Sequence, residues 1–175
     1  ADGTPVAVTA SYDKTAIVWD LETGTPRHTL TGHCGEVNGV AGAVLPDGTP
    51  VAVTASYDKT AIVWDLETGT PRHTLTGHGE WLSAVAYTPL PDGTPLAVTT
   101  GHDKTVIVWD LATGRKMWSS QLHDTGLSIA AVPAGFLIGR GPDIQCFLWT
   151  DLEGLLARGW PEPSSGQRIC SYSAE

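Results

Sequence analysis

The stretch Asp58-Lys59-Thr60-Ala61-Ile62-Val63-Trp64-Asp65 decides the fold. It joins a short turn to a run of β-branched residues that ends in Trp-Asp, which is typical of a strand that follows a hairpin turn. The same pattern occurs at residues 13–20 and at residues 103–110. The three Trp-Asp pairs are 45 residues apart, and a fixed period of this length indicates a repeat architecture. A weaker fourth copy ends at Trp149-Thr150.

Length, composition and charge limit the class of protein. A chain of 175 residues with 41% apolar content is long enough for one core, so we expect a single domain over 1–175. The formal net charge of -9 argues against nucleic-acid binding, which needs clustered Lys and Arg. No apolar run is long enough to span a membrane. Because Cys34, Cys146 and Cys170 form no Cys-x-x-Cys pair, we expect reduced thiols in a cytoplasmic protein without a metal or cofactor.

Two of the repeat units are copies of each other. Residues 2–33 are identical to residues 47–78, and residues 92–114 follow the same pattern with substitutions. Identity over this length exceeds what a fold requires, so it indicates recent duplication or deliberate construction.

Each unit contains four predicted strands. In the second unit they are residues 37–45, 49–55, 60–65 and 70–75, separated by turn residues such as Pro46-Asp47-Gly48 and Glu67-Thr68-Gly69. Hairpin links between short strands predict an antiparallel sheet. One such sheet cannot bury both of its faces, whereas sheets that stack around an axis can. The fold class predicted is therefore all-β, a β-propeller of four-stranded antiparallel blades.

Recurring motifs make a family resemblance specific. Gly32-His33 and Gly77-His78 precede their units, an Asp occupies the turn before the third strand, and Trp-Asp ends that strand. These features resemble the WD-repeat β-propeller family over residues 1 to about 159. The fourth unit departs from the pattern, with Leu122-His123 for Gly-His and Trp149-Thr150 for Trp-Asp.

The resemblance implies a hydrogen-bonded set of His, Ser or Thr, Asp and Trp inside each blade, with a structural role. Such a set also resembles a hydrolase triad, but its recurrence in every blade favours the structural interpretation. The expected sets are Ser11, Asp13 and Trp19 in blade one; His33, Ser56, Asp58 and Trp64 in blade two; His78, Asp103 and Trp109 in blade three, with Thr99 as the only nearby hydroxyl; and His123, Asp143 and Trp149 in blade four.

The first predicted blade lacks its first strand. We expect blade one at about 2–31, blade two at 32–76, blade three at 77–121 and blade four at 122–162. The C-terminal segment 167–174 has strand-like composition and is predicted to complete blade one, either of its own chain or of a second chain across a two-fold interface, the alternative being a disordered tail. Propellers have about four to eight blades, and four would need sharp angles between blades. We therefore predict two chains in one eight-bladed ring, with a fragment of a longer array as the alternative.

The resemblance implies a non-enzymatic scaffold that presents a rigid face to a protein or peptide. Tyr and Trp in turns at one rim suit binding hot spots, and acidic side chains there favour a basic partner. The candidate binding residues are Tyr12, Glu36, Tyr57, Glu80, Trp81 and His102.

Two other functions remain open. The near-identical blades also fit an engineered assembly, or a recently amplified fragment of a larger signalling protein, with no ligand of its own. A hydrolase acting in the central channel would need a distinct nucleophile–base pair or metal cluster, and no such motif is present in the sequence.

Overall fold

The computed structural model describes residues 3–140, 143–148 and 170–172. Within these ranges the chain forms β-strands and no helix, and hence no helix long and apolar enough to cross a membrane. The strands, in chain order, are β1 (Val6–Ala10), β2 (Thr15–Asp20), β3 (Pro26–Thr31), β4 (Val37–Val44), β5 (Pro50–Ser56), β6 (Thr60–Asp65), β7 (Pro71–Thr76), β8 (Leu82–Pro89), β9 (Pro95–Gly101), β10 (Thr105–Asp110), β11 (Lys116–Gln121), β12 (Ser128–Val132), β13 (Gly135–Arg140), β14 (Asp143–Leu148) and β15 (Cys170–Tyr172).

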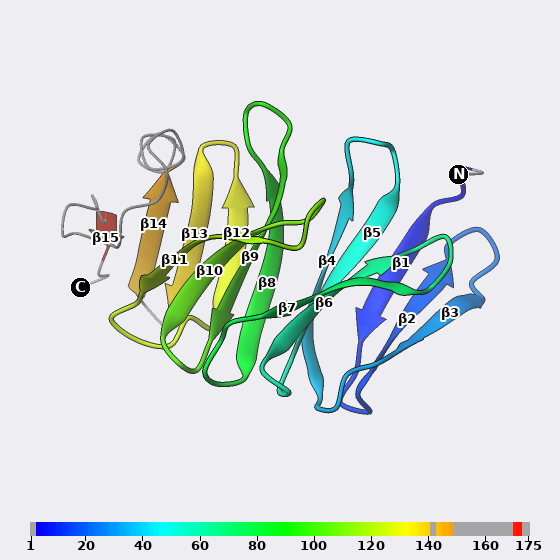
Figure 1. Cartoon of the computed structure of the whole chain (residues 1–175), viewed down its shortest axis with the longest axis horizontal. Coiled ribbons are helices and arrows are strands. Elements are labelled where there is room, and N and C mark those ends of the chain that lie inside the picture. The colour runs from blue at the N-terminus through cyan, green and yellow to red at the C-terminus, as the bar shows by residue number, and fades with distance from the viewer. Residues whose placement is uncertain (1–2, 141–142, 149–169, 173–175) are drawn as a thin grey trace.

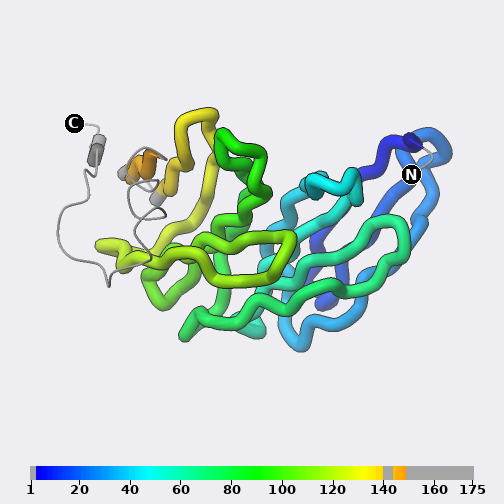
Figure 2. The backbone as a smooth tube through the Cα atoms, turned by 45° about the horizontal axis from the view of Figure 1, so that its top comes forward, coloured from blue at the N-terminus to red at the C-terminus, as the bar shows by residue number. Residues whose placement is uncertain are grey.

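The strands form four antiparallel sheets in chain order. Sheet 1 has the order β1-β2-β3, sheet 2 β4-β5-β6-β7, sheet 3 β8-β9-β10-β11 and sheet 4 β12-β13-β14-β15. The sheets stand side by side in a fan, with sheet 1 and sheet 4 at its opposite ends (Figure 1). Their inner strands β1, β4, β8 and β12 pack beside one another in succession. Figure 2 shows the same succession from blue to yellow in a view turned by 45°. The all-β expectation is confirmed, and the arrangement is consistent with a propeller.

The sequence of each hairpin explains its geometry. In the turn between β5 and β6, the carboxylate of Asp58 accepts hydrogen bonds from the backbone N–H and the hydroxyl of Thr60, at 3.0 and 2.6 Å. Lys59 adopts a positive φ of 71°, which is uncommon for a residue other than glycine. The Asp side chain therefore holds the tight turn that the Trp-Asp strand requires.

Alternation along the strands gives every sheet two apolar faces. We call the face toward the next sheet in the chain the forward face and the other the backward face. Since successive side chains of a strand point to opposite faces, Val53 and Val63 lie on the forward face of sheet 2, and Ala52 and Trp64 on its backward face.

The core consists of the joints between these faces. The forward face of sheet 2 (Val51, Val53, Ala61 and Val63) packs on the backward face of sheet 3 (Ala97, Ile107, Trp109 and Leu111). Equivalent clusters join sheet 1 to sheet 2 and sheet 3 to sheet 4. Each interior sheet is thus buried on both sides, which a single four-stranded sheet cannot achieve.

The described part of the C-terminal segment does not complete sheet 1 of its own chain. This part, β15, pairs with β14 through Ile144↔Tyr172 and Cys146↔Cys170, whereas the prediction paired segment 167–174 with the first blade. Sheet 1 has three strands, and β1 has no neighbour on its inner edge among the described residues. The reason is distance: the two ends of the fan lie apart (Figure 1), so the segment pairs with the free strand edge of its own sheet.

Sheet 4 departs from the repeat more than its sequence indicated. The link between β13 and β14 has two residues, 141–142, where that between β5 and β6 has three, 57–59. In consequence, Phe147 of β14 pairs with Phe136 of β13, and this pair occupies the same register position as the pair of Trp64 with Ala52 in sheet 2. The position predicted for Trp149 is therefore taken by Phe147, while Trp149 itself lies outside the described residues.

Candidate functional site

A chain of hydrogen bonds runs through the interior of sheet 2 toward the rim that carries the turn between β5 and β6. The indole N–H of Trp64 donates to the hydroxyl of Thr54 at 2.8 Å. That hydroxyl lies 2.7 Å from Nε2 of His33, whose Nδ1 lies 2.8 Å from the carboxylate of Asp58. The same carboxylate accepts the backbone N–H of Cys34 at 2.9 Å. One polar network thus ties strand, turn and inter-sheet loop together.

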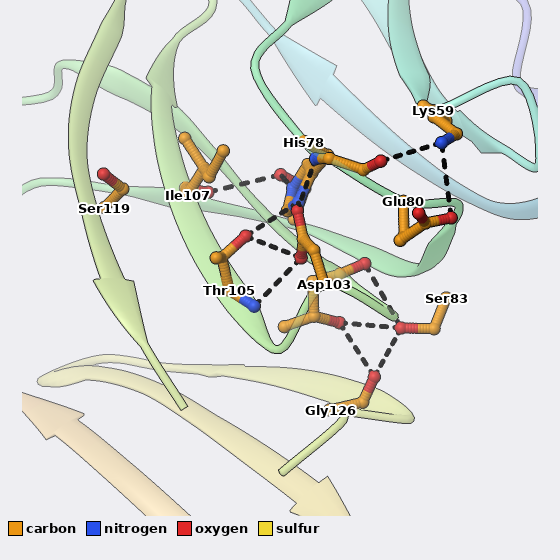
Figure 3. Close-up of polar contacts among 12 residues, drawn as sticks. Lys59, His78, Glu80, Ser83, Asp103, Thr105, Ile107, Ser119 and Gly126 are labelled. Atoms are coloured by element: carbon orange, nitrogen blue, oxygen red, sulfur yellow. Dashed lines mark hydrogen bonds and ion pairs between the residues drawn. The ribbon is translucent and has the colours of Figure 1, made fainter. Parts of the chain in front are cut away.

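Sheet 3 repeats this network. Trp109 donates to Thr99 at 2.8 Å, Thr99 lies 2.9 Å from Nε2 of His78, and Nδ1 of His78 lies 3.0 Å from Asp103. Thr105 adds bonds from its backbone N–H and its hydroxyl to the Asp103 carboxylate, as Figure 3 shows.

The titratable groups of these networks have shifted pKa values. Burial works to raise the pKa of Asp58, but hydrogen bonds from Thr60, His33 and the Cys34 N–H outweigh it and lower the pKa. The pKa of Asp103 is lowered in the same way. Desolvation lowers the pKa of His78, against the opposing effect of the Asp103 carboxylate.

The neutral ring of His78 and the carboxylate of Asp103 together determine the direction of these hydrogen bonds. The lowered pKa of His78 leaves its ring neutral at neutral pH. Because an ionised carboxylate can only accept, Nδ1–H donates to Asp103; Nε2 then accepts the Thr99 hydroxyl proton, while the Thr99 oxygen accepts the Trp109 N–H. Every polar atom named in this chain then has a partner.

Thr99 was anticipated from the sequence in the network of sheet 3, but Thr54 was not anticipated in that of sheet 2. Ser56, predicted to join the set of blade two, instead accepts the backbone N–H of Asp58 within the turn, at 3.1 Å. Thr54 lies in its place between indole and imidazole, and only its counterpart Thr99 was anticipated. The signal was present in the sequence, because Thr9, Thr54 and Thr99 each stand ten residues before a Trp, on the same strand face.

The first and last sheets carry reduced sets. In sheet 1, Trp19 donates to Thr9 at 2.9 Å, and Ser11 accepts the N–H of Asp13 at 3.2 Å, in a unit whose sequence contains no preceding His.

Sheet 4 does not assemble its predicted set. His123 is exposed, and Asp143 opens strand β14, opposite Arg140, instead of lying in a turn. Ile138 has the place of Thr54 in the register, so the interior of this sheet is apolar at that point.

Three of the predicted rim residues meet in one aromatic stack. The rings of Tyr57 and Trp81 are stacked, with centroids 4.2 Å apart and planes at 20°. Trp81 stacks on its other side against His102, at 3.3 Å and 16°. The backbone holds the stack, because the N–H of His102 donates to the carbonyl of Trp81 at 2.9 Å. We call Tyr57, Trp81 and His102 the aromatic stack.

The other rim residues surround the stack less closely. Tyr12 is 74% exposed and belongs to sheet 1. The carbonyl of Glu36 accepts the N–H of Tyr57 at 2.9 Å, and its side chain is exposed. Glu80 forms an ion pair with Lys59 at 3.3 Å, and Lys59 also donates to the Gly79 carbonyl (Figure 3). Part of the negative charge expected on this rim is therefore neutralised.

The geometry of this rim suits the binding of a partner more than catalysis. The stack is broad, partly exposed and positioned by backbone bonds, and such rigid aromatic surfaces suit binding. Within the described ranges, no group of three or more His, Cys, Asp and Glu side chains is placed to hold a metal ion.

Comparison with known proteins agrees with this architecture. The family model described as WD domain, G-beta repeat matches residues 24–65 and 69–110, which contain strands β3 to β6 and β7 to β10. Each match ends on a Trp-Asp pair, at Asp65 and Asp110. A comparison with the curated proteins finds no match. Proteins built from such repeats generally mediate contacts between proteins. Residues 24–65 and 69–110 therefore match WD repeats, and these two matches support the WD-repeat family for this chain.

Proposed function

We propose that this chain is a non-enzymatic scaffold that binds a protein or peptide on the rim carrying the aromatic stack. The observation that carries the proposal is the stack itself. Tyr57, Trp81 and His102 come from two sheets and one connecting loop, yet form one surface. Tyr57 is 39% exposed, and Trp81 and His102 are partly exposed, so the stack is accessible to a partner. Trp and Tyr are enriched among the residues that dominate binding free energies.

Charge supports a basic partner. The formal net charge of the chain is -9, and the Glu36 side chain is exposed beside the stack. Glu80 contributes less because Lys59 pairs with it. A peptide with one or two Lys or Arg residues around an aromatic or aliphatic anchor fits this distribution, and its association rate should fall as salt is added.

A displayed random-peptide library tests the proposal. Peptides selected on the intact chain should be enriched in basic residues, and Trp81→Ala should weaken their binding by about tenfold or more. Val44→Ala is the matched control, because Val44 is exposed at the other end of its strand from the rim. Selected peptides that bind the Trp81 variant as well as the original chain would place the binding surface elsewhere.

A chain without a ligand of its own is the second candidate. The complete identity of residues 2–33 and 47–78 favours it, because specialised binding normally selects differences between repeats. The same library decides between the two: an engineered or recently amplified array with no ligand should enrich no family of peptides.

The geometry gives no support to a hydrolase at the polar sets. A nucleophilic hydroxyl must be open to substrate, but the hydroxyl beside His33 is that of Thr54, which is fully buried and accepts the Trp64 indole N–H.

We also propose that two chains complete one ring of eight blades. Four sheets in an open fan leave one sheet face at each end without a neighbouring sheet among the described residues, and closed symmetric assemblies remove such faces. Sedimentation velocity on the full chain should give a single species of twice the chain mass. A monodisperse monomer would contradict the ring.

A further inference from the structure

The two identical units act as an internal control for the backward face of sheet 1. Leu66 is 6% exposed in the joint between sheets 1 and 2, whereas its counterpart Leu21 is 57% exposed. Trp64 is buried in the same joint, and its counterpart Trp19 is half-buried. Since the sequences are the same, the difference arises from the surroundings: within the described residues no sheet packs on the backward face of sheet 1, and sheet 1 has three strands where sheet 2 has four. This face, formed by Ala7, Thr9, Ile17, Trp19 and Leu21, is therefore one half of a joint whose complete form exists elsewhere in the chain.

The forward face of sheet 4 is the other half, because no sheet of the described residues packs on it. Leu137 and Cys146 pair in the same register as Val53 and Val63 of sheet 2, on the side opposite the Phe136–Phe147 cluster that contacts sheet 3. Ile144 lies on that side as well and is 42% exposed. Leu137, Ile144 and Cys146 give this face an apolar centre, and Ser128 on β12 lies on the same face beside Gly139.

We propose that the backward face of sheet 1 is the docking site for the forward face of sheet 4 of a second copy. The inference rests on the two-chain ring proposed above and specifies its joint. Within the chain, every joint sets a backward face against a forward face: Trp64 and Leu66 lie against Ala16 and Val18. The same pairing between copies is heterologous, and two such joints close a two-chain ring.

A joint between two backward faces fits less well. Both halves would then present the large Trp19 side chain, whereas in the joints between sheets 1 and 2 and between sheets 2 and 3 the Trp lies against a forward face of Val, Ala and Leu residues without an aromatic ring. Leu137, Ile144 and Cys146 likewise carry no aromatic ring. Interior packing tolerates little mismatch in volume, which favours the heterologous joint.

A charge on the docking site tests the first half of the proposal. Leu21→Asp should convert two-chain assemblies into monomers, because association would bury an unpaired carboxylate and weaken by about a hundredfold or more. The matched control is Val44→Asp: Val44 has the same 57% exposure but lies on the inner strand β4 of sheet 2. The Val44→Asp chain should therefore remain assembled. Near-ultraviolet circular dichroism would show that both variants stay folded.

Mixing variants tests the second half. Ile144→Asp should also give monomers by sedimentation velocity. A mixture of Leu21→Asp and Ile144→Asp chains should form mixed two-chain species, because one intact joint remains available between unlike chains. Two-chain species that persist in both single variants, or single variants that never combine on mixing, would overturn the proposed joint. A wild-type chain that is already monomeric would overturn both joint and ring. Neither result bears on peptide binding at Trp81, which the library measures separately.

Discussion

Thr54 holds a central place among the residues of the buried network. Its single hydroxyl serves the indole of Trp64 and the imidazole of His33 at once. In sheet 1 the equivalent Thr9 serves Trp19 alone and is exposed. The same residue type in the same local sequence therefore has two different energetic roles, and the difference is set by burial.

Thr54→Val should lower the free energy of unfolding by about 1–3 kcal/mol, because it leaves two buried polar groups without a partner. Thr9→Val should cost less than about 1 kcal/mol, since water can reach the half-buried Trp19. Urea unfolding followed by tryptophan fluorescence measures both. Equal losses in the two variants would contradict the burial argument.

Acid should weaken the fold in two pH windows. The folded pKa of His78 lies below its ordinary value of 6.5, so as the pH falls below that value the unfolded chain takes up the proton first and unfolding is favoured. The pKa values of Asp58 and Asp103 lie below 3.8. Their stabilisation is complete above that value and is lost as the pH falls through their folded pKa.

Melting temperatures between pH 8 and pH 3 would reveal both windows. His78→Asn should flatten the upper window, whereas replacing the exposed His123 should leave it in place. A melting temperature that stays constant from pH 7 to pH 5 would contradict the assignment of a neutral, buried His78.

At the scale of the structural elements, contacts between the side chain of one hairpin and the backbone of the next help to join neighbouring sheets. Nε2 of His28, on β3 of sheet 1, lies 3.0 Å from the carbonyl of Glu67 in the turn before β7 of sheet 2. His73 repeats the contact with Ala112 at 3.3 Å. These turns contain glycines with positive φ that leave room for the imidazole ring.

Gly69→Ala and Gly24→Ala separate this contact from the turn itself. Both glycines have φ near 70°, at +71° and +69°, so each Ala should cost about 1 kcal/mol in backbone strain. A Cβ at Gly69 would also lie 2.8 Å from Cγ of His28, while one at Gly24 meets nothing within 4 Å. Denaturant unfolding should show the larger loss for Gly69→Ala. Identical losses would mean that the hairpin contact does not stabilise the joint.

Individual elements also show how far sequence reasoning reached. Hairpin turns and strand alternation predicted sheets 2 and 3 from local rules. The sequence placed Tyr57, Trp81 and His102 in loops at one rim, but it did not predict that their rings stack. Sheet 4 was misread because the prediction followed the spacing of Asp143 and Trp149. A link between β13 and β14 that is one residue shorter changes which residue enters the joint, and β-strand register is sensitive to such changes.

At the scale of the whole molecule, position in the fan decides the environment of identical sequences. Leu21 and Leu66 differ in burial because sheet 2 has a neighbouring sheet on each side, whereas sheet 1, in the part of the chain that is described, has a neighbour on one side and one strand fewer. In repeat architectures each unit gains stability from its neighbours, so an end unit is less protected than an interior one.

Hydrogen exchange should detect this difference within a single peptide. Residues 6–19 and 51–64 have the same sequence, so their proteolytic peptides have the same mass. Because β5 is paired with β4 while the inner edge of β1 has no partner in the described chain, the shared peptide should show two exchange populations by mass spectrometry. A single population would indicate that both edges are equally protected.

The amino-acid sequence alone determined the repeat, the antiparallel hairpins, the apolar faces and the family, because these depend on residues close together in the chain and on a fixed period. Tertiary structure decided which face each copy buries, which hydroxyl bridges Trp and His, and where the C-terminal strand pairs. Those outcomes depend on what packs against a residue from a distant part of the chain, and identical sequences such as residues 2–33 and 47–78 cannot encode that difference themselves.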